Sequence, residues 1–342
     1  MNDALRAWVA RRTAELVAGL IEDAPALGVG PTSAAGGATV LDCGVSAPGS
    51  WEAGRRIAVL AHGGMMDARI GLTELCGVIL PEFLADSWSP ADSAYGLQVS
   101  LPLSEVDPAI RISGPVRERL VPAGHKPQWT GTGTNPWGVV VVETARLPGS
   151  EVVAAVADRA ELPPSALTLV VVPLASPAGA AQIAGRLNES VLFTWCESLG
   201  LAADRVLGIV GSVPIAPVAP GGEMPLTEDD MIHYAGRATV LVDAPPSCDL
   251  DWIAEQLTFG STTARGRLFS ALLAEAGGVF EAIPGIAALN KIARVTLVDR
   301  WTGRVVTAGT ADERILAAGL GVACSQDGRA PSSRGGRGRE RT

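Results

Sequence analysis

The sequence predicts an α/β protein, and three observations carry this prediction. Residues 167–175 form an uncharged run rich in valine and leucine without polar alternation, which is typical of a strand buried on both faces. Ser176 and Pro177 follow directly, and these residue types favour the N-cap and the first position of a helix. Helical patterns and apolar strands alternate along the chain, which is the pattern of an α/β fold.

The first predicted element is a helix over residues 5–21, where apolar residues recur with a helical period and charged residues lie between them. Because these charges interrupt any apolar stretch, the segment is not a signal peptide. The longest uncharged span, residues 162–185, contains four prolines that would break a membrane helix. We therefore expect no transmembrane segment and no membrane partner.

The middle of the chain contains a predicted strand at residues 139–142 and a helical segment that begins near residue 151. We place a boundary between two lobes near Pro148 and Gly149, which gives an N-terminal lobe of residues 1–149 and a C-terminal lobe of residues 150–322. Residues 323–342 are rich in arginine and glycine and have no apolar face, so they are predicted to be a disordered basic tail. Nucleic-acid binding by this tail is not expected, because the chain as a whole has a net charge of −9.

Composition favours an intracellular enzyme, since 342 residues with 47% hydrophobic content are enough for a substantial core. The five cysteines are scattered and contain no C-x-x-C, so neither a disulfide framework nor a zinc knuckle is expected. A reducing cytoplasm is the simple inference. The three histidines are not spaced for a shared helix face, and no metal site is predicted.

The strongest candidate for a catalytic site is the helix that we expect to begin at Ser176. Arg186 and Glu189 lie about three turns along it and are separated by i,i+3, so their side chains lean over the same surface. The small residues at 178–185 allow another backbone or a flat ligand to approach closely. The alternative is that Arg186 and Glu189 form a solvated ion pair, which would stabilise the helix by only about 0.3 to 0.5 kcal/mol.

This segment resembles the corresponding strand and helix of the methenyltetrahydromethanopterin cyclohydrolase family, whose pattern P-x-A-S-x-x-G-x-x-Q-I-x-x-R-x-x-E is met in full at residues 173–189. Residues 37–55, GATVLDCGVSAPGSWEAGR, resemble the N-terminal signature of the family. Residues 213–220, VPIAPVAP, and 229–242, DDMIHYAGRATVLV, resemble its later motifs in the same order. Weaker similarity at residues 113–120 and 294–309 extends the match over about residues 1–322.

The resemblance implies addition of water to the methenyl bridge of a tetrahydromethanopterin-type one-carbon carrier, with formation of the formyl derivative and the reverse dehydration. It implies that Glu189 exchanges protons and that Arg186 keeps this carboxylate ionised and oriented. It also implies two lobes with a deep pocket between them, a homotrimer, and no metal or organic cofactor. The residues that we expect to bind the substrate are Ser176, Gln182, Tyr234, Arg237 and Arg117.

Several departures from the family pattern leave other functions open. Ala235 stands where Y-G-G-R has a glycine, and the acidic residue of K-I-D-P is lost in the segment at residues 282–285. A divergent member could act on another cyclic amidine or pterin-like heterocycle in specialised metabolism. A noncatalytic pterin-binding protein is a further alternative, against which the retention of Arg186 and Glu189 argues.

Overall fold

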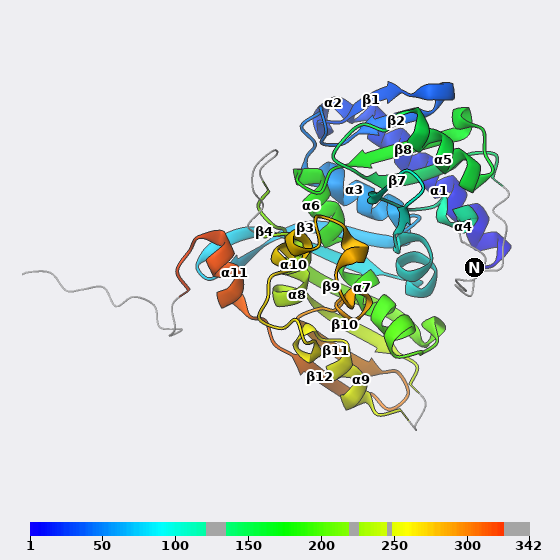
Figure 1. The fold of residues 1–342 in the computed structure, drawn as a ribbon. Coiled ribbons are helices and arrows are strands. Elements are labelled where there is room, and N and C mark those ends of the chain that lie inside the picture. The colour runs from blue at the N-terminus through cyan, green and yellow to red at the C-terminus, as the bar shows by residue number, and fades with distance from the viewer. Residues whose placement is uncertain (121–134, 219–225, 245–247, 325–342) are drawn as a thin grey trace, which may run out of the picture.

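The structure, a computed structural model, describes residues 1–120, 135–218, 226–244 and 248–324, and these form two six-stranded β-sheets with helices packed on them (Figure 1). The α/β class is therefore confirmed. The first sheet has the order β1-β2-β8-β7-β6-β5, with β1 at Gly30–Ser33, β2 at Thr39–Asp42, β5 at Leu101–Leu103, β6 at Asp107–Ser113, β7 at Gly138–Glu143 and β8 at Leu167–Val172. The second has the order β12-β11-β10-β9-β4-β3, with β3 at Met66–Leu75, β4 at Val78–Ser87, β9 at Val206–Pro214, β10 at Arg237–Val242, β11 at Arg294–Asp299 and β12 at Val305–Gly309.

The helices include a long N-terminal one, which confirms the prediction for residues 5–21. In chain order they are α1 at Asp3–Glu22, α2 at Ala24–Leu27, α3 at Trp51–Ala61, α4 at Arg117–Leu120, α5 at Ser150–Ala160, α6 at Pro177–Ala184, α7 at Leu187–Phe193, α8 at Glu228–Ala235, α9 at Leu250–Gln256, α10 at Phe269–Glu275 and α11 at Glu313–Leu320. None of the helices in the described part of the chain combines the length and apolar character needed to cross a membrane.

The centre of the first sheet is buried on both faces, as the unbroken apolar run predicts. β8 pairs in parallel with β2 on one side and with β7 on the other. Leu169 and Val171 face a core shared with α5, whereas Val170 and Val172 face a core shared with α3. Since no face of β8 meets water, every position favours an apolar residue.

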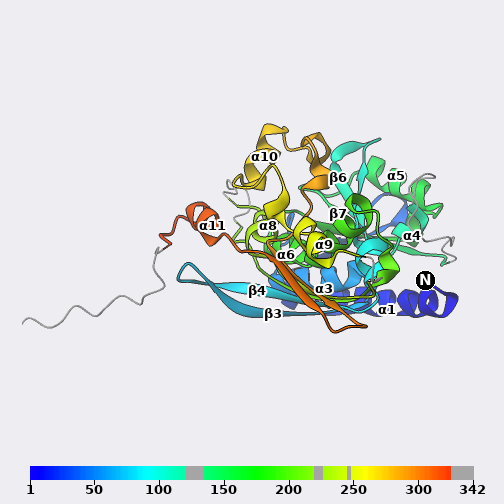
Figure 2. The same cartoon turned by 90° about the horizontal axis from the view of Figure 1, so that it is seen from below.

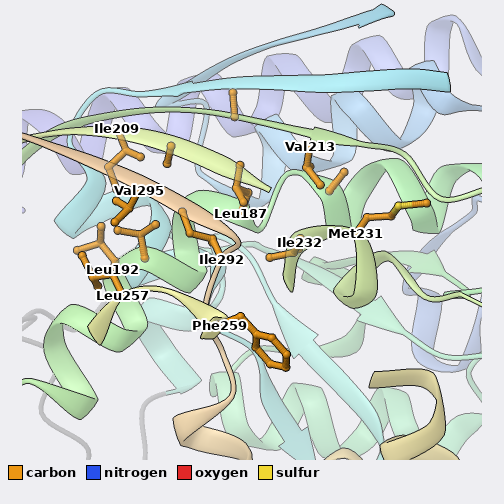
Figure 3. Packing of buried hydrophobic residues seen from close by; sticks show 14 of the residues in the cluster. Leu187, Leu192, Ile209, Val213, Met231, Ile232, Leu257, Phe259, Ile292 and Val295 are labelled. Carbon is orange, nitrogen blue, oxygen red and sulfur yellow. The ribbon is translucent and has the colours of Figure 1, made fainter. Parts of the chain in front are cut away.

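The second sheet is covered on one face only. β10 alternates strictly between exposed and buried residues, which is typical of a sheet with one solvated face. Its inner face packs on α7 and α8 in a core that includes Leu187, Ile209 and Ile232 (Figure 3). Seen from below, β3 and β4 run along the lower side of the molecule with helices above them (Figure 2).

Helices α3 and α6 lie together between the two sheets (Figure 1). A Cβ atom added to Gly54 would lie 2.2 Å from the carbonyl oxygen of Ala178, and one added to Gly185 would lie 2.6 Å from Cβ of Ala58. The small residues of α6 therefore serve the close approach of another backbone.

The predicted helix after β8 begins as expected but does not continue to Glu189. The hydroxyl of Ser176 accepts a hydrogen bond from the Gly179 N–H at 2.9 Å, and Pro177 occupies the first helical position. The helix then ends at Ala184, and the Arg186 N–H donates to the Ile183 carbonyl in a tighter turn. The prediction of one helix over this stretch was wrong, because this turn separates α6 from α7 and leaves Arg186 as the residue that precedes α7.

The sheets do not follow the sequence division at residue 149. β3 and β4 join the second sheet from the N-terminal part of the chain, and β8 joins the first sheet from the C-terminal part. These exchanges define no domain boundary by themselves, and the lobes at residues 1–149 and 150–322 stay a prediction. The tail predicted at residues 323–342 lies outside the described residues from position 325 onward.

A disulfide joins Cys76, in the turn between β3 and β4, to Cys324 after α11. This differs from the expectation of no disulfide framework. The two cysteines are 248 residues apart, so their pairing depends on a tertiary contact and gives no local signal in the sequence.

Candidate active site

A cavity of about 280 Å³ lies beside the turn between α6 and α7. Its wall is formed by residues of β6 and β7, of α6 and α7, of α8 and of the segment after α10. The polar residues in its wall are Ser100, Arg111, Glu143, Arg186, Glu189, Ser190, Thr227, Glu228, Asp229, Glu281 and Asn290. Its large apolar side chains include Ile183, Phe193, Ile232, Phe269 and Phe280, so the cavity combines charged groups with flat apolar surface.

Arg186 connects the polar residues of this wall. Its Nε donates to Oε2 of Glu189 at 3.0 Å, and one terminal nitrogen donates to Oε1 of Glu143 at 2.7 Å. The other terminal nitrogen donates to the carbonyl oxygen of Gln98 at 3.3 Å. Burial alone would lower the pKa of Arg186, but the charges of Glu143 and Glu189 outweigh it and raise this pKa further above its ordinary value. The guanidinium is therefore permanently charged and fixed in position.

Glu189 is held from two sides. Its Oε2 accepts from Arg186, and its Oε1 accepts from the side-chain nitrogen of Asn290 at 3.3 Å. The exposed fractions of the two side chains are only 11% for Arg186 and 6% for Glu189, so the interpretation as a solvated ion pair was wrong. A paired carboxylate in the wall of a cavity suits proton transfer to or from a bound molecule.

Glu143 completes this group and was not predicted from the sequence. It ends β7 after four consecutive valines, and its side chain is 4% exposed. β7 and β8 are parallel neighbours, so Glu143 and the residues that lead into α6 lie at the same edge of the sheet. A charged residue at the carboxyl end of a buried parallel strand was the available signal, because ligands bind at this edge in α/β proteins.

Asp229 lines the cavity from the first turn of α8. Its pKa is raised to about 7, mainly by burial, and the neighbouring charges of Asp230, Glu143 and Glu189 act in the same direction. The positive charge of Arg186 opposes this shift. The sequence analysis identified this segment only as a family motif and did not predict a role for Asp229, because the chemistry of this residue follows from the tertiary arrangement.

Arg111 supplies a second cation to the wall of the cavity. Its guanidinium donates to the hydroxyl of Ser100 at 2.7 Å, pairs with Glu281 and lies 4.6 Å from the ring centroid of Phe280. Burial lowers the pKa of Arg111, and the nearby carboxylate of Glu143 opposes this effect. These contacts join β6 to the segment after α10, which also lines the cavity.

The five residues predicted to bind substrate are not among those that line this cavity. Ser176 caps α6, and Gln182 is fully buried in the same helix with no hydrogen-bond partner among the described residues. Arg117 donates to the carbonyl oxygen of Gly96 at 2.5 Å.

The other two belong to the second sheet and its covering helix. The Tyr234 hydroxyl donates to the Arg267 carbonyl at 2.6 Å. Arg237 lies on the open face of β10 and pairs with Glu82 at 2.8 Å. The structure thus brings together Arg186 and Glu189 alone of the seven predicted site residues, and substrate binding by the other five stays a prediction.

Known proteins with similar sequences belong to one enzyme family. Residues 8–320 match the family model described as Cyclohydrolase (MCH). A protein from Methanothermobacter marburgensis is 28% identical over 313 residues, which cover 90% of this chain and 97% of the relative. A relative from Methanocaldococcus jannaschii is 28% identical over 92% of this chain and 98% of its own length.

A relative from the bacterium Methylobacterium organophilum is 32% identical over 282 residues, or 79% of this chain and 85% of that protein. All three relatives are named methenyltetrahydromethanopterin cyclohydrolase. Since the family model spans nearly all of the described fold, including strands of both sheets and the residues that line the cavity, the chain belongs to the MCH cyclohydrolase family.

Proposed function

We propose that the protein hydrolyses the methenyl bridge of methenyltetrahydromethanopterin to the formyl derivative, and that it also catalyses the reverse dehydration. The observation that carries the proposal is the buried group of Glu143, Arg186 and Glu189 in the wall of the cavity. The names of the relatives supply the substrate. The reaction belongs to one-carbon metabolism and is a hydrolysis at a carbon–nitrogen bond of a cyclic amidine.

The charges of the cavity suit a cationic amidinium substrate. Five carboxyl groups and two guanidinium groups line it, and even without Glu228 and Asp229, whose pKa values are raised by burial, the carboxylates outnumber the guanidinium groups. A cation that enters this space gains electrostatic stabilisation that water would otherwise weaken. The large apolar side chains offer surface to a flat heterocycle.

In the proposed mechanism, Glu189 takes a proton from the water that attacks the amidinium carbon. Arg186 holds the Glu189 carboxylate in its ionised form and orients it. Arg186 has no role as an acid, because its guanidinium keeps its proton. The proposed chemistry uses these side chains and water and calls for no metal or organic cofactor.

We further propose that the two sheets and their helices form two lobes, with the cavity as the pocket between them, and that the protein is a homotrimer. The open face of the second sheet supports an assembly, since Leu84, Val210, Leu241 and Val305 are exposed there. Light scattering of the purified protein tests this proposal, and a mass of one chain at working concentration would overturn it.

The activity is tested by following the ultraviolet absorbance of methenyltetrahydromethanopterin with purified protein, because ring opening removes the amidinium chromophore. We expect rapid loss of absorbance with the wild type and a rate lower by about 10² or more with Glu189→Gln. Arg186→Ala is expected to lose the activity as well. Glu151→Gln, on the exposed start of α5, is the matched control and keeps the wild-type rate.

Two outcomes would contradict the proposal. Binding of the substrate without loss of absorbance would indicate a noncatalytic pterin-binding protein. Neither binding nor turnover, in protein with a cooperative unfolding transition, would indicate a different cyclic amidine or heterocycle as the substrate.

A further inference from the structure

We propose that Asp229 is a second catalytic carboxylate of this site, which gives a proton to the leaving nitrogen while Glu189 takes one from the attacking water. The inference rests on the proposed function, since it assigns a step of that same reaction. It assigns the two proton transfers to two carboxylates of the cavity wall that come from different helices, α7 and α8.

The position of Asp229 follows from the way α8 begins. Thr227 and Asp230 form a reciprocal cap: the Thr227 N–H and hydroxyl donate to Oδ2 of Asp230, and the Thr227 hydroxyl accepts from the Asp230 N–H. Asp230 also accepts from the Phe269 N–H, and Glu228 accepts from the Ala216 N–H at 2.6 Å. Two of the three consecutive acidic residues are therefore engaged by the backbone.

Asp229 differs from both of these neighbours. Like Glu228 it lines the cavity, but within the described residues its carboxylate has no hydrogen bond or ion pair. The cap of Thr227 and Asp230 fixes the first turn of α8, which carries Asp229. The Asp229 side chain therefore has a defined position in the wall but makes no polar contact with the described residues that stabilises the fold. A carboxylate that is positioned but unpaired is free to contact a bound molecule.

Glu189 and Asp229 have different capacities for proton transfer. Glu189 accepts hydrogen bonds from Arg186 and Asn290, which orient its carboxylate for the role of proton acceptor. Asp229 has a pKa raised to about 7, first by burial, so it holds a proton near neutral pH and can also release it. The two carboxylates have different surroundings, since Glu189 is paired with Arg186 and Asp229 is unpaired among the described residues, and this suits them to opposite roles.

The charged groups that face Asp229 come from each side of the cavity. They are Arg111 on β6, Glu143 on β7, Arg186 and Glu189 at the start of α7, and Asp230 and Glu228 on α8 itself. Burial of Asp229 and the repulsion from Asp230, Glu143 and Glu189 keep its proton bound, and Arg186 limits the effect.

The proton balance of the reaction is complete with these two groups. Water forms a bond to the amidinium carbon and gives one proton to ionised Glu189, which leaves a neutral carbinol. As the carbon–nitrogen bond breaks, protonated Asp229 gives its proton to the nitrogen. The carbinol hydroxyl then forms the formyl carbonyl and returns its proton to Asp229. Glu189 releases its proton to solvent, so one cation and one water give one formyl product and one proton.

The test compares Asp229→Asn and Asp229→Ser with the wild type and with Glu189→Gln in the absorbance assay. In the hydrolytic direction Asp229 must be protonated, so wild-type kcat falls as pH rises through about 7. We expect kcat to fall by about 10²-fold in both Asp229 variants, with loss of the pH dependence near pH 7. KM changes far less than kcat, since the heterocycle keeps its other contacts.

Glu281→Gln is the matched control, because it removes a negative charge from the same wall at a carboxylate that is already paired with Arg111. It is expected to change KM and to keep the fall of kcat near pH 7. If Glu281→Gln reproduces the effect of Asp229→Asn, the role of Asp229 is electrostatic only and the inference is wrong.

The two levels of the proposal fail in different ways. An inactive wild type overturns the proposed function. An active wild type with an inactive Glu189→Gln and a fully active Asp229→Asn overturns the assignment of Asp229 alone. Circular dichroism and the melting temperature of both Asp229 variants exclude misfolding as the cause of a lower rate, and two different replacements guard against a defect peculiar to one of them.

Discussion

The two sheets each position an arginine that pairs with a carboxylate, and the two arginines differ in burial. At the edge of the first sheet, Arg186 is 11% exposed and pairs with Glu143 and Glu189 in the wall of a cavity. On the open face of the second sheet, Arg237 is 60% exposed and pairs with Glu82. Both arginines belong to segments that resemble the same family, so the residue type and the motif do not distinguish them. Burial does, because charges interact more strongly where water is excluded.

The largest effect that tests this comparison is expected for Arg186→Ala against Arg237→Ala. Removal of Arg186 leaves two buried carboxylates without their counter-charge, which costs about 3–5 kcal/mol. Removal of Arg237, which is 60% exposed, leaves a single carboxylate, that of the 10% exposed Glu82, and is expected to cost less, about 1 kcal/mol. Urea unfolding of both variants measures the difference. Similar losses in the two variants would show that burial does not separate these pairs.

A second test concerns the apolar residues of the same two regions. Leu169 in β8 is fully buried, whereas Leu241 in β10 is 41% exposed. Leu169→Ala is expected to lower the free energy of unfolding by about 2–5 kcal/mol, since it removes packed methyl groups and leaves a cavity. Leu241→Ala is expected to lower it by about 0.5 kcal/mol or less. Denaturant midpoints of the two variants measure the difference. If Leu241→Ala lowers the free energy of unfolding strongly and the loss depends on protein concentration, an assembly covers this face.

The smallest expected effect concerns the pH dependence of stability. His62, at the end of α3, is fully buried, and burial lowers its pKa from 6.5 to about 4. The unfolded chain then binds a proton that the folded protein does not, so stability is present above pH 6.5 and is lost as pH falls toward 4. The loss from this residue reaches up to ~3 kcal/mol.

His62→Asn isolates this contribution, because asparagine keeps a donor for the carbonyl oxygen of Ala58, which lies 2.8 Å from Nδ1 of His62. Unfolding free energies measured from pH 7 to pH 4 should fall less steeply in the variant than in the wild type. An unchanged slope would mean that His62 is protonated in the folded protein without cost. His233 is retained in both proteins and therefore cancels from the comparison.

Much of the fold near the site could be predicted from local patterns. The apolar run at β8 requires burial on both faces, and Ser176 and Pro177 mark the start of α6 by the hydrogen bonds that they can and cannot make. The turn at Gly185 and Arg186 could not be predicted, because both residues keep right-handed helical dihedral angles and only the hydrogen bonds change. The placement of β3 and β4 in the second sheet also depends on contacts far apart in the chain.

By itself, the sequence determined the fold class, the family, and the pair Arg186 and Glu189, since three-residue spacing on a helical turn brings these side chains together wherever the helix ends. Only the tertiary structure decided that the pair is buried, that Glu143 joins it from another strand, and that Asp229 faces it from α8. The physical reason is the range of the interactions, because helix caps, strand burial and i,i+3 contacts depend on residues that are neighbours in the sequence. The pKa of a carboxylate depends on every charge and every apolar group that folding brings near it.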